Sequence, residues 1–194
     1  MRKIGVIGFG GRLGDLIQNV LLELGMDVKI AAVADTDLTA VRGRLRHPGL
    51  TADGIRFYTD AREMLDNEEL DGCMIGTRCN THTPYAVEVL RRNIPLFLEK
   101  PVSTTIEDLR ALAAAGKATT AQTVVSFPLR TSGIVRKAKA IIDSGEIGEI
   151  QHVQAYNNVP YGGCYYHSWY RDESITGGLF LQKATHDLDY IQYM

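Results

Sequence analysis

Residues 3–14 read KIGVIGFGGRLG, and this stretch decides the fold. A strand-like apolar run is followed by glycines at positions 8, 10, 11 and 14. An apolar helical pattern then continues to residue 24 and stops at Gly25. A second strand-like run, residues 28–34, ends directly before Asp35. Strand, glycine-rich turn, helix, strand and acid in this order are typical of a dinucleotide-binding βαβ unit.

The glycine turn predicts a set of cofactor contacts. Glycines let backbone N–H groups approach a pyrophosphate, and an acid about 20 residues further on can accept a hydrogen bond from a ribose hydroxyl. The spacing departs from G-x-G-x-x-G, because Leu13 stands at the third glycine position and Gly14 follows it. A purely structural turn is the alternative interpretation. The residues expected at the cofactor are Gly8, Gly10, Gly11, Arg12, Leu13 and Asp35.

Composition argues against several classes of protein. The 194 residues carry a net charge of −2, which is not the basic balance of a nucleic-acid-binding protein. No apolar run approaches the roughly 20 residues that span a bilayer. A strand-like run begins by residue 3, which leaves no room for a signal peptide. Three cysteines without metal-ligand spacing suit a reduced, cytoplasmic protein, and no metal site is expected.

Strands and helices alternate through residue 127. Further strands are expected at residues 55–58, 72–76, 96–99 and 124–127, and helices at 38–46, 61–66, 84–92 and 105–121. Thr59 or Asp60 is expected to cap the 61–66 helix, and Thr104 or Thr105 the 105–121 helix. Six strands with intervening helices predict an α/β fold with a doubly wound, Rossmann-type parallel sheet over residues 1–127.

The pattern changes after residue 127. A helix is expected at 134–144, a strand at 149–156, irregular structure at 157–177 and a helix at 178–194. The apolar stripe of the last helix comprises Leu181, Ala184, Leu188 and Ile191. One strand cannot make a sheet, so residues 128–194 are interpreted as the beginning of an incomplete α+β domain.

Two segments at the expected carboxyl edge of the sheet carry groups suited to chemistry. Lys100 follows strand 96–99, where ligands bind in open α/β sheets, and its cation could polarise a substrate hydroxyl or carbonyl. A solvated surface lysine is the alternative. Asn80 and His82 follow strand 72–76 and could contact the cofactor or cap the helix that begins near Pro84.

The last helix carries a third candidate group. Gln182 and His186 are four residues apart, and His186 and Asp189 are three apart, so they share one helix face. This face lies roughly opposite the apolar stripe. Imidazole is the side chain best suited to proton transfer near neutral pH. A solvated histidine on a polar face is the alternative.

Four segments together resemble the glucose-fructose oxidoreductase/inositol dehydrogenase/MocA (Gfo/Idh/MocA) family of nicotinamide-dependent oxidoreductases. They are EKP at 99–101, NTH at 80–82, the glycine pair at 177–178 and KATHDLD at 183–189. The resemblance runs from residue 3 to 194. It implies hydride transfer between NAD (with NADP as a less favoured cofactor) and a sugar, inositol or related polyol, in a homo-oligomer. Family members continue into a large antiparallel sheet, so a truncated, non-catalytic nucleotide-binding fragment is the alternative.

The resemblance also implies individual roles. Lys100 would lie beside the nicotinamide, and His186 would transfer the proton. Many members have an acid where this chain has Gln182, with Lys183 as the neighbouring polar group. Residues 157–176 would contact the sugar, with a surface loop or dimer contact as the alternative. The implied catalytic residues are Lys100, His186 and Lys183; the further cofactor contacts are Thr77, Asn80, His82, Glu99 and Lys100; the substrate contacts are Lys100, Tyr161, Trp169, Arg171, Gln182 and His186, with Tyr165, Tyr166 and His167 nearby.

Overall fold

The computed structural model describes residues 1–158, 160 and 162–194. The chain separates into two compact units, Met1–Val125 and Ser126–Met194. Among the residues described, no helix is both long and apolar enough to cross a membrane. Of the residues expected at the substrate, Tyr161 lies outside the described residues.

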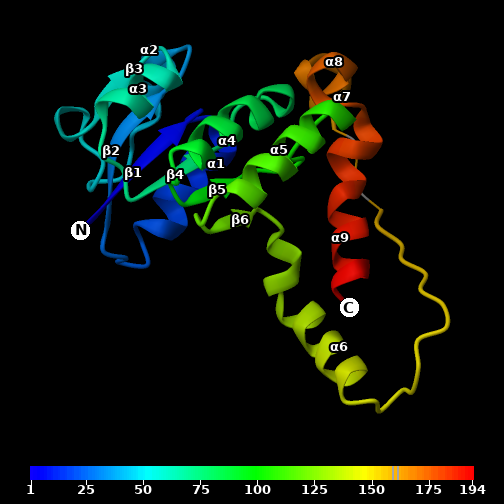
Figure 1. Cartoon of the computed structure of the whole chain (residues 1–194). Helices are drawn as coiled ribbons and strands as arrows, with labels where there is room; N and C mark the ends of the chain where they lie inside the picture. The colour runs from blue at the N-terminus through cyan, green and yellow to red at the C-terminus, as the bar shows by residue number, and fades with distance from the viewer. Residues whose placement is uncertain (159, 161) are drawn as a thin grey trace. The chain divides into compact units, whose positions relative to one another are not determined.

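The first unit is built on a six-stranded parallel sheet. Its strands are β1 (Arg2–Ile7), β2 (Val28–Ala34), β3 (Arg56–Tyr58), β4 (Gly72–Ile75), β5 (Leu96–Leu98) and β6 (Thr123–Val125). They lie in the order β3-β2-β1-β4-β5-β6 (Figure 1), and each neighbouring pair is parallel. The predicted doubly wound α/β fold is confirmed. The strand order reverses between β1 and β4, which is where such sheets open a crevice for ligands.

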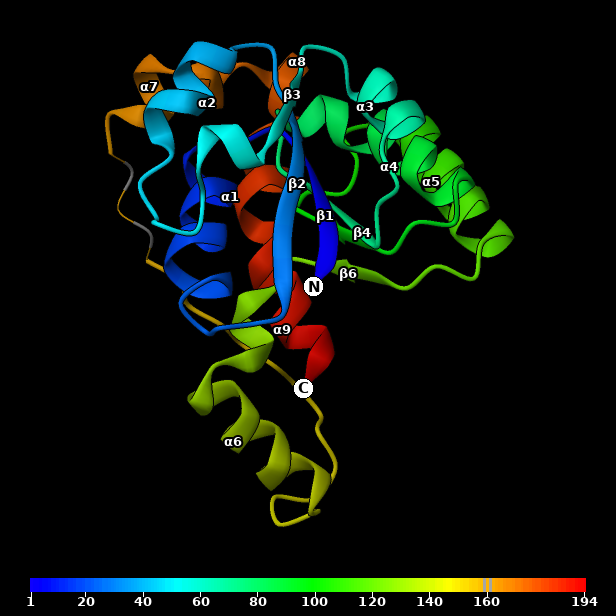
Figure 2. The ribbon, with the colours of Figure 1, turned by 90° about the vertical axis from the view of Figure 1, so that its left-hand side faces the viewer.

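Helices cover both faces of this sheet (Figure 2). One face carries α1 (Gly11–Leu16), its π-helical continuation η1 (Ile17–Leu21) and α2 (Leu38–Arg44); the other carries α3 (Ala61–Asn67), α4 (His82–Arg91) and α5 (Ile106–Ala118). The short 3-10 turns η2 (Ala52–Gly54) and η3 (Cys79–Thr81) precede β3 and α4. Each face has its own apolar core, with Phe9 and Leu13 fully buried in one and Met64 and Leu98 in the other. Strands buried on both faces explain the nearly continuous apolar runs in the sequence.

Side-chain caps begin two helices at residues that the sequence indicates. The carboxylate of Asp60 accepts hydrogen bonds from the backbone N–H groups of Arg62 (2.6 Å) and Glu63 (3.2 Å) at the start of α3. The hydroxyl oxygen of Thr105 accepts from the backbone N–H of Asp108 (3.1 Å) at the start of α5. Each cap satisfies backbone donors that a helix leaves without an internal partner.

Gly8 turns the chain out of β1. Its φ angle of +83° lies in the left-handed region that glycine tolerates. A Cβ atom here would lie 2.8 Å from the backbone nitrogen of Thr77 and 2.9 Å from the backbone carbonyl carbon of Gly76. Because both neighbours are backbone atoms, they cannot rotate away, and only glycine fits this close approach between the β1 and β4 loops.

The second unit consists of short and medium helices. They are η4 (Pro128–Thr131), α6 (Gly133–Asp143), α7 (Cys164–His167), η5 (Trp169–Arg171), α8 (Glu173–Thr176), η6 (Phe180–Ala184) and α9 (Thr185–Tyr193). The expected helix at 134–144 is present as α6, and Gly145 follows it with a φ angle of +74°. Left-handed glycine is a common helix stop.

Two expectations for this unit are wrong. Residues 149–156 form no strand: their alternating pattern favours an extended chain, but no described residue pairs with them, and a strand needs a partner for its backbone hydrogen bonds. Residues 157–177 contain α7, η5 and α8 rather than only irregular structure. Local caps explain two of these turns, because Ser168 accepts from the backbone N–H of Tyr170 (3.4 Å) and Asp172 from that of Ser174 (3.0 Å).

The last helix also buries a face other than the one its apolar stripe indicates. It begins as the π-helical η6 and continues as α9. Leu188 in the stripe is 51% exposed, whereas Gln182 and Asp189 are 6% and 8% exposed. The polar face that carries His186 is therefore the inner one. Asp189 can be buried because it is paired with a cation, as described below.

Candidate functional site

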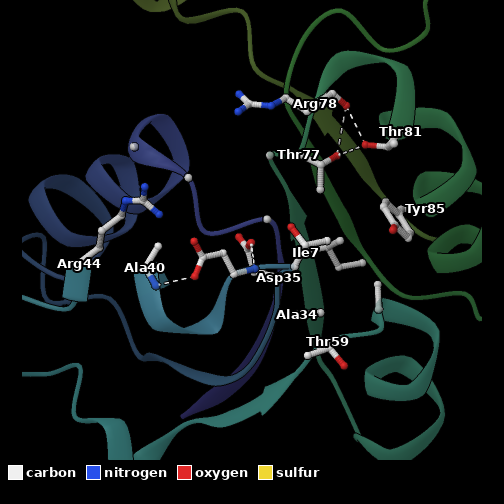
Figure 3. A pocket seen from close by; sticks show the side chains of 17 residues that line it. Ile7, Ala34, Asp35, Ala40, Arg44, Thr59, Thr77, Arg78, Thr81 and Tyr85 are labelled. Carbon is white, nitrogen blue, oxygen red and sulfur yellow. Dashed lines mark hydrogen bonds between the residues drawn. The ribbon is translucent and has the colours of Figure 1, made fainter. Parts of the chain in front are cut away.

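A pocket of about 450 Å³ opens at the carboxyl ends of β1, β2 and β4 (Figure 3). Its walls are the glycine turn, the β2–α2 loop and the β4–α4 loop. Figure 3 shows Asp35, Ala40 and Arg44 along one side of the pocket and Thr77 and Tyr85 along the other. The pocket thus lies at the point where the strand order reverses, as expected for a nucleotide site in this type of sheet.

Two backbone N–H groups hold the carboxylate of Asp35 in one orientation. One oxygen accepts a hydrogen bond from Phe9 in the glycine turn (2.9 Å), and the other accepts from Asp37 (3.0 Å). Each carboxylate oxygen has about two acceptor positions, so both retain capacity for a further donor such as a ribose hydroxyl. Asp35 is therefore hydrogen-bonded to the glycine turn without the help of a ligand.

The glycine turn has room for a pyrophosphate. Gly10 and Gly11 line the pocket, and a Cβ atom on Gly11 would meet no atom within 4 Å. The protein itself does not fill that space. Leu13 differs, because its side chain is fully buried and packs on Gly76, where a Cβ atom would come within 2.8 Å of it. Leu13 is 0% exposed and does not line the pocket, which corrects the expectation that it contacts the cofactor.

Arg12 and Glu99 connect the glycine turn to the end of β5. Arg12 Nε lies 3.4 Å from Glu99 Oε1; the Arg12 side chain is 64% exposed, and that of Glu99 is 8% exposed. The nearly buried carboxylate thus obtains an opposite charge from the turn. Such a pair places two of the expected cofactor residues next to each other, although they are far apart in the sequence.

Lys100 directly follows β5 at the same edge of the sheet, and its side chain is half-buried. Its charge acts on Cys79 in the β4–α4 loop. Burial raises the pKa of the Cys79 thiol, and the nearby Lys100 ammonium opposes this shift. The ammonium group of Lys100 therefore lies close to the loop that forms one wall of the pocket.

The β4–α4 loop places its three expected residues differently. Thr77 lines the pocket, and its hydroxyl accepts a hydrogen bond from Thr81 Oγ1 (2.8 Å). Asn80 is exposed and does not cap α4, whose N-cap residue is Thr81. His82 is only 2% exposed, with both ring nitrogens against backbone carbonyl oxygens. Its ring is not available to a ligand, which corrects the expectation that His82 contacts the cofactor.

In the second unit, His186 lies in a small cluster of aromatic and charged side chains. The ring of Phe127 meets the imidazole edge-on, with ring centroids 5.9 Å apart. One turn further along α9, Asp189 forms a bidentate pair with Arg130, whose Nε donates to Asp189 Oδ2 at 2.8 Å. These hydrogen bonds raise the pKa of Arg130. The sequence gives no sign that Phe127 and Arg130 belong to this cluster, because no periodic pattern links them to a helix more than 50 residues away.

The segment before η6 gathers aromatic side chains. Trp169 stacks on Tyr170 with centroids 4.0 Å apart, and Tyr165 lies 5.2 Å from Tyr170. Lys183 Nζ lies 5.1 Å from the centroid of the Tyr165 ring, close enough for a cation–π interaction. Arg171 instead donates to the backbone oxygen of Tyr166 (3.4 Å). Three of the expected substrate or catalytic residues therefore lie on one short segment and the helix beside it.

Replacing Arg130 with alanine is expected to destabilise the second unit. Asp189, whose side chain is 7% exposed, would lose its partner, while Arg130 itself is 46% exposed. Because Arg130 is partly solvated, the expected loss of unfolding free energy is about 1–3 kcal/mol, below that of a fully buried pair. Urea denaturation checks this, with Arg136→Ala on the exposed face of α6 as the control. Equal stability of the two variants would contradict the interpretation.

Comparison with known proteins extends over both units. Residues 2–127 match the GFO_IDH_MocA family, described as an oxidoreductase family with an NAD-binding Rossmann fold, and residues 135–194 match the GFO/IDH/MocA C-terminal domain. Rhizopine catabolism protein MocA of Rhizobium meliloti is 25% identical over 99% of this chain and 56% of that protein. Inositol 2-dehydrogenase 2 of Saccharopolyspora erythraea is 31% identical over 75% of this chain and 42% of that protein.

A solved structure is similar to this chain over both units. Myo-inositol 2-dehydrogenase from Lactobacillus plantarum superimposes with a TM-score of 0.85 at 25% identity, covering 99% of this chain and 56% of that one. The chain spans about half the length of the relatives that it matches. These matches show that the chain belongs to the Gfo/Idh/MocA family of oxidoreductases.

Proposed function

We propose that the protein containing this chain is an NAD-dependent dehydrogenase that acts on an inositol, a sugar or a related polyol. The observation that carries the proposal is the pocket in which Asp35 is hydrogen-bonded to the glycine turn beside unfilled space at Gly11. Bound NAD would supply the hydride acceptor. The glycine turn would hold its pyrophosphate, and Asp35 its adenosine ribose.

The chemistry assigned to the protein is oxidation of a carbinol. NAD, when bound, would accept the hydride released as the C–H bond breaks; the O–H proton would pass to His186, and the carbon would become a carbonyl. Lys100 stabilises the negative charge that develops on the oxygen. His186 acts as the general base, and Lys183 is its polar neighbour on the helix in place of an acid at Gln182. This assignment is supported by the resemblance of the motifs and by the burial of the polar face of the last helix.

The substrate class is supported by two independent features. The relatives named above include inositol dehydrogenases. In addition, Tyr165, Trp169 and Tyr170 form an aromatic cluster next to Lys183, in which Trp169 stacks on Tyr170. Flat aromatic faces with adjacent polar groups suit a ring that carries both C–H and O–H groups. Association of the protein with copies of itself stays a prediction.

Asp35 is expected to set the preference for NAD over NADP. Its carboxylate would accept from the ribose hydroxyl of NAD and repel a 2′-phosphate. Asp35→Ala should therefore weaken NAD binding and narrow its advantage over NADP by about 1–3 kcal/mol, as for a lost hydrogen bond to a charged group. Calorimetric titration with both cofactors measures this, and Asp53→Ala in the exposed η2 turn is the control. Equal or tighter binding of NADP by the unmodified chain would refute the assignment.

The function itself is tested by a panel of inositols, sugars and other polyols with NAD, following absorbance of the reduced cofactor. Turnover of a member of the panel supports the proposal. Tight NAD binding without turnover of any member would instead favour the alternative, a non-catalytic nucleotide-binding protein. No binding of NAD or NADP would exclude both.

A further inference from the structure

Two consecutive side chains at the start of α4 hold the segment that follows Lys100. His82 Nδ1 lies 2.7 Å from the backbone oxygen of Pro101, and Thr83 Oγ1 donates to the backbone oxygen of Val102 at 2.9 Å. Both side chains are 2% exposed. The first turn of α4 is therefore held to residues 101–102 by two side-chain contacts that span 19 residues of sequence, one buried and one partly buried.

The other ring nitrogen of His82 faces the wall of the pocket. His82 Nε2 lies 3.2 Å from the backbone oxygen of Thr77, a residue that lines the pocket together with Asp35. The imidazole thus lies between two loops: the β4–α4 loop, which shapes the pocket, and the β5–α5 loop, which carries Lys100.

The proton of this imidazole can be assigned from its surroundings. Burial lowers the pKa of His82, and the Lys100 charge acts in the same direction, against the two carbonyl contacts and Glu99. A neutral ring has one N–H group, and the shorter contact is the one from Nδ1 to Pro101. The donated hydrogen bond therefore goes to Pro101, next to Lys100, while Nε2 is left as an acceptor near Thr77 and contributes no hydrogen bond there.

We propose that His82 is a positioning residue, which sets the place of Lys100 relative to the cofactor pocket through its hydrogen bond to Pro101. This inference rests on the proposed function, because it takes Lys100 to act at the nicotinamide. His82 does not touch the cofactor. Replacing a histidine that only fills the core would weaken binding of all parts of the cofactor equally. Replacing a positioning residue would weaken binding only of the part of the cofactor that Lys100 contacts.

Two isosteric variants separate the ring's two contacts. The amide nitrogen of asparagine occupies the position of Nδ1, so His82→Asn can keep the hydrogen bond to Pro101. The amide nitrogen of glutamine reaches the position of Nε2, so His82→Gln keeps only the side that faces Thr77. The measurement is the affinity of NADH relative to ADP-ribose, which lacks the nicotinamide, in fluorescence and calorimetric titrations. Their ratio reports the contribution of the nicotinamide half.

His82→Gln is expected to lower this ratio about fivefold to tenfold, the size of one lost buried hydrogen bond, with ADP-ribose affinity nearly unchanged. His82→Asn should keep the ratio within about twofold, as should the same two substitutions at the exposed His152. Lys100→Ala should lower the ratio as well, and adding His82→Gln to it should lower the ratio no further, because His82 acts through Lys100.

Several outcomes would overturn the assignment. If the affinities for NADH and ADP-ribose fall in parallel in both variants, His82 is only a core residue. If the ratio of the two affinities is unchanged in a folded His82→Gln protein, His82 does not act through Lys100. If the variants do not fold, nitrogen NMR of the unmodified chain decides: a proton on Nε2 rather than Nδ1 of His82 contradicts the proposal. Failure of the unmodified chain to bind either ligand would refute the proposed function, and this assignment with it.

Discussion

Replacing Lys100 with alanine is expected to lower kcat by about 10²–10³, the usual effect of removing one preorganised group that stabilises an oxyanion. Lys100 follows β5, and its charge acts on Cys79, which lies in the β4–α4 loop behind the pocket-lining residues Thr77 and Arg78. The variant should lose no more than about tenfold in NAD affinity, the share of the nicotinamide half, because the adenosine half would still be held by the glycine turn and Asp35. Steady-state kinetics on the best polyol, with a separate NAD titration, measure both quantities.

The control for this variant is Lys117→Ala. Lys117 lies in the last turn of α5 and is exposed, so its loss removes the same charge from the same unit without touching the pocket. Its kcat should stay within about twofold of the unmodified value. A Lys100→Ala enzyme that turns over as fast as this control would show that the oxyanion is stabilised elsewhere.

His186→Ala is the second variant with a large expected effect, a fall in kcat of about 10²–10⁴, as for loss of a general base. A base accepts a proton only in its neutral form, so polyol oxidation by the unmodified protein should decline as the pH falls. The variant should lose this decline along with most of its activity. Rate profiles from mildly acidic to mildly alkaline pH, in the oxidation direction, test both parts.

His152→Ala serves as the matched control, because His152 is exposed and lies in the same unit. It should keep both the rate and the acid-side decline. Retention of that decline in His186→Ala would mean that another group takes the proton. Lys183, which lies on the same helix and contacts the Tyr165 ring, would then be the next residue to replace.

Much of the first unit follows from local pattern. The glycine turn, the alternation of apolar strands with helices and the caps at Asp60 and Thr105 all appear in the structure where the sequence indicates them. These features depend on residues within a few positions of one another. Backbone conformation, helix capping and the period of apolar residues are all short-range properties, so one sequence contains the information for them.

The second unit shows where local pattern fails. Residues 149–156 alternate as a strand does but pair with no described strand, and the last helix buries Asp189 rather than Leu188. Strand formation depends on a partner, and burial of an acid depends on a cation. The partner of Asp189, Arg130, is 59 residues away. Neither the partner strand nor the cation is visible in the periodicity of the segment itself.

The sequence alone determined the order of the strands and helices in the first unit, the glycine turn and the identity of Asp35, Lys100 and His186 as candidates. Only the tertiary structure decided how these groups are held: Asp35 by Phe9, Glu99 by Arg12, and the Lys100 segment by His82. The tertiary structure also buries His82, so its ring cannot contact the cofactor. The physical reason is that a hydrogen bond or ion pair needs two groups at about 3 Å, and across many residues that distance is set by packing, not by sequence separation.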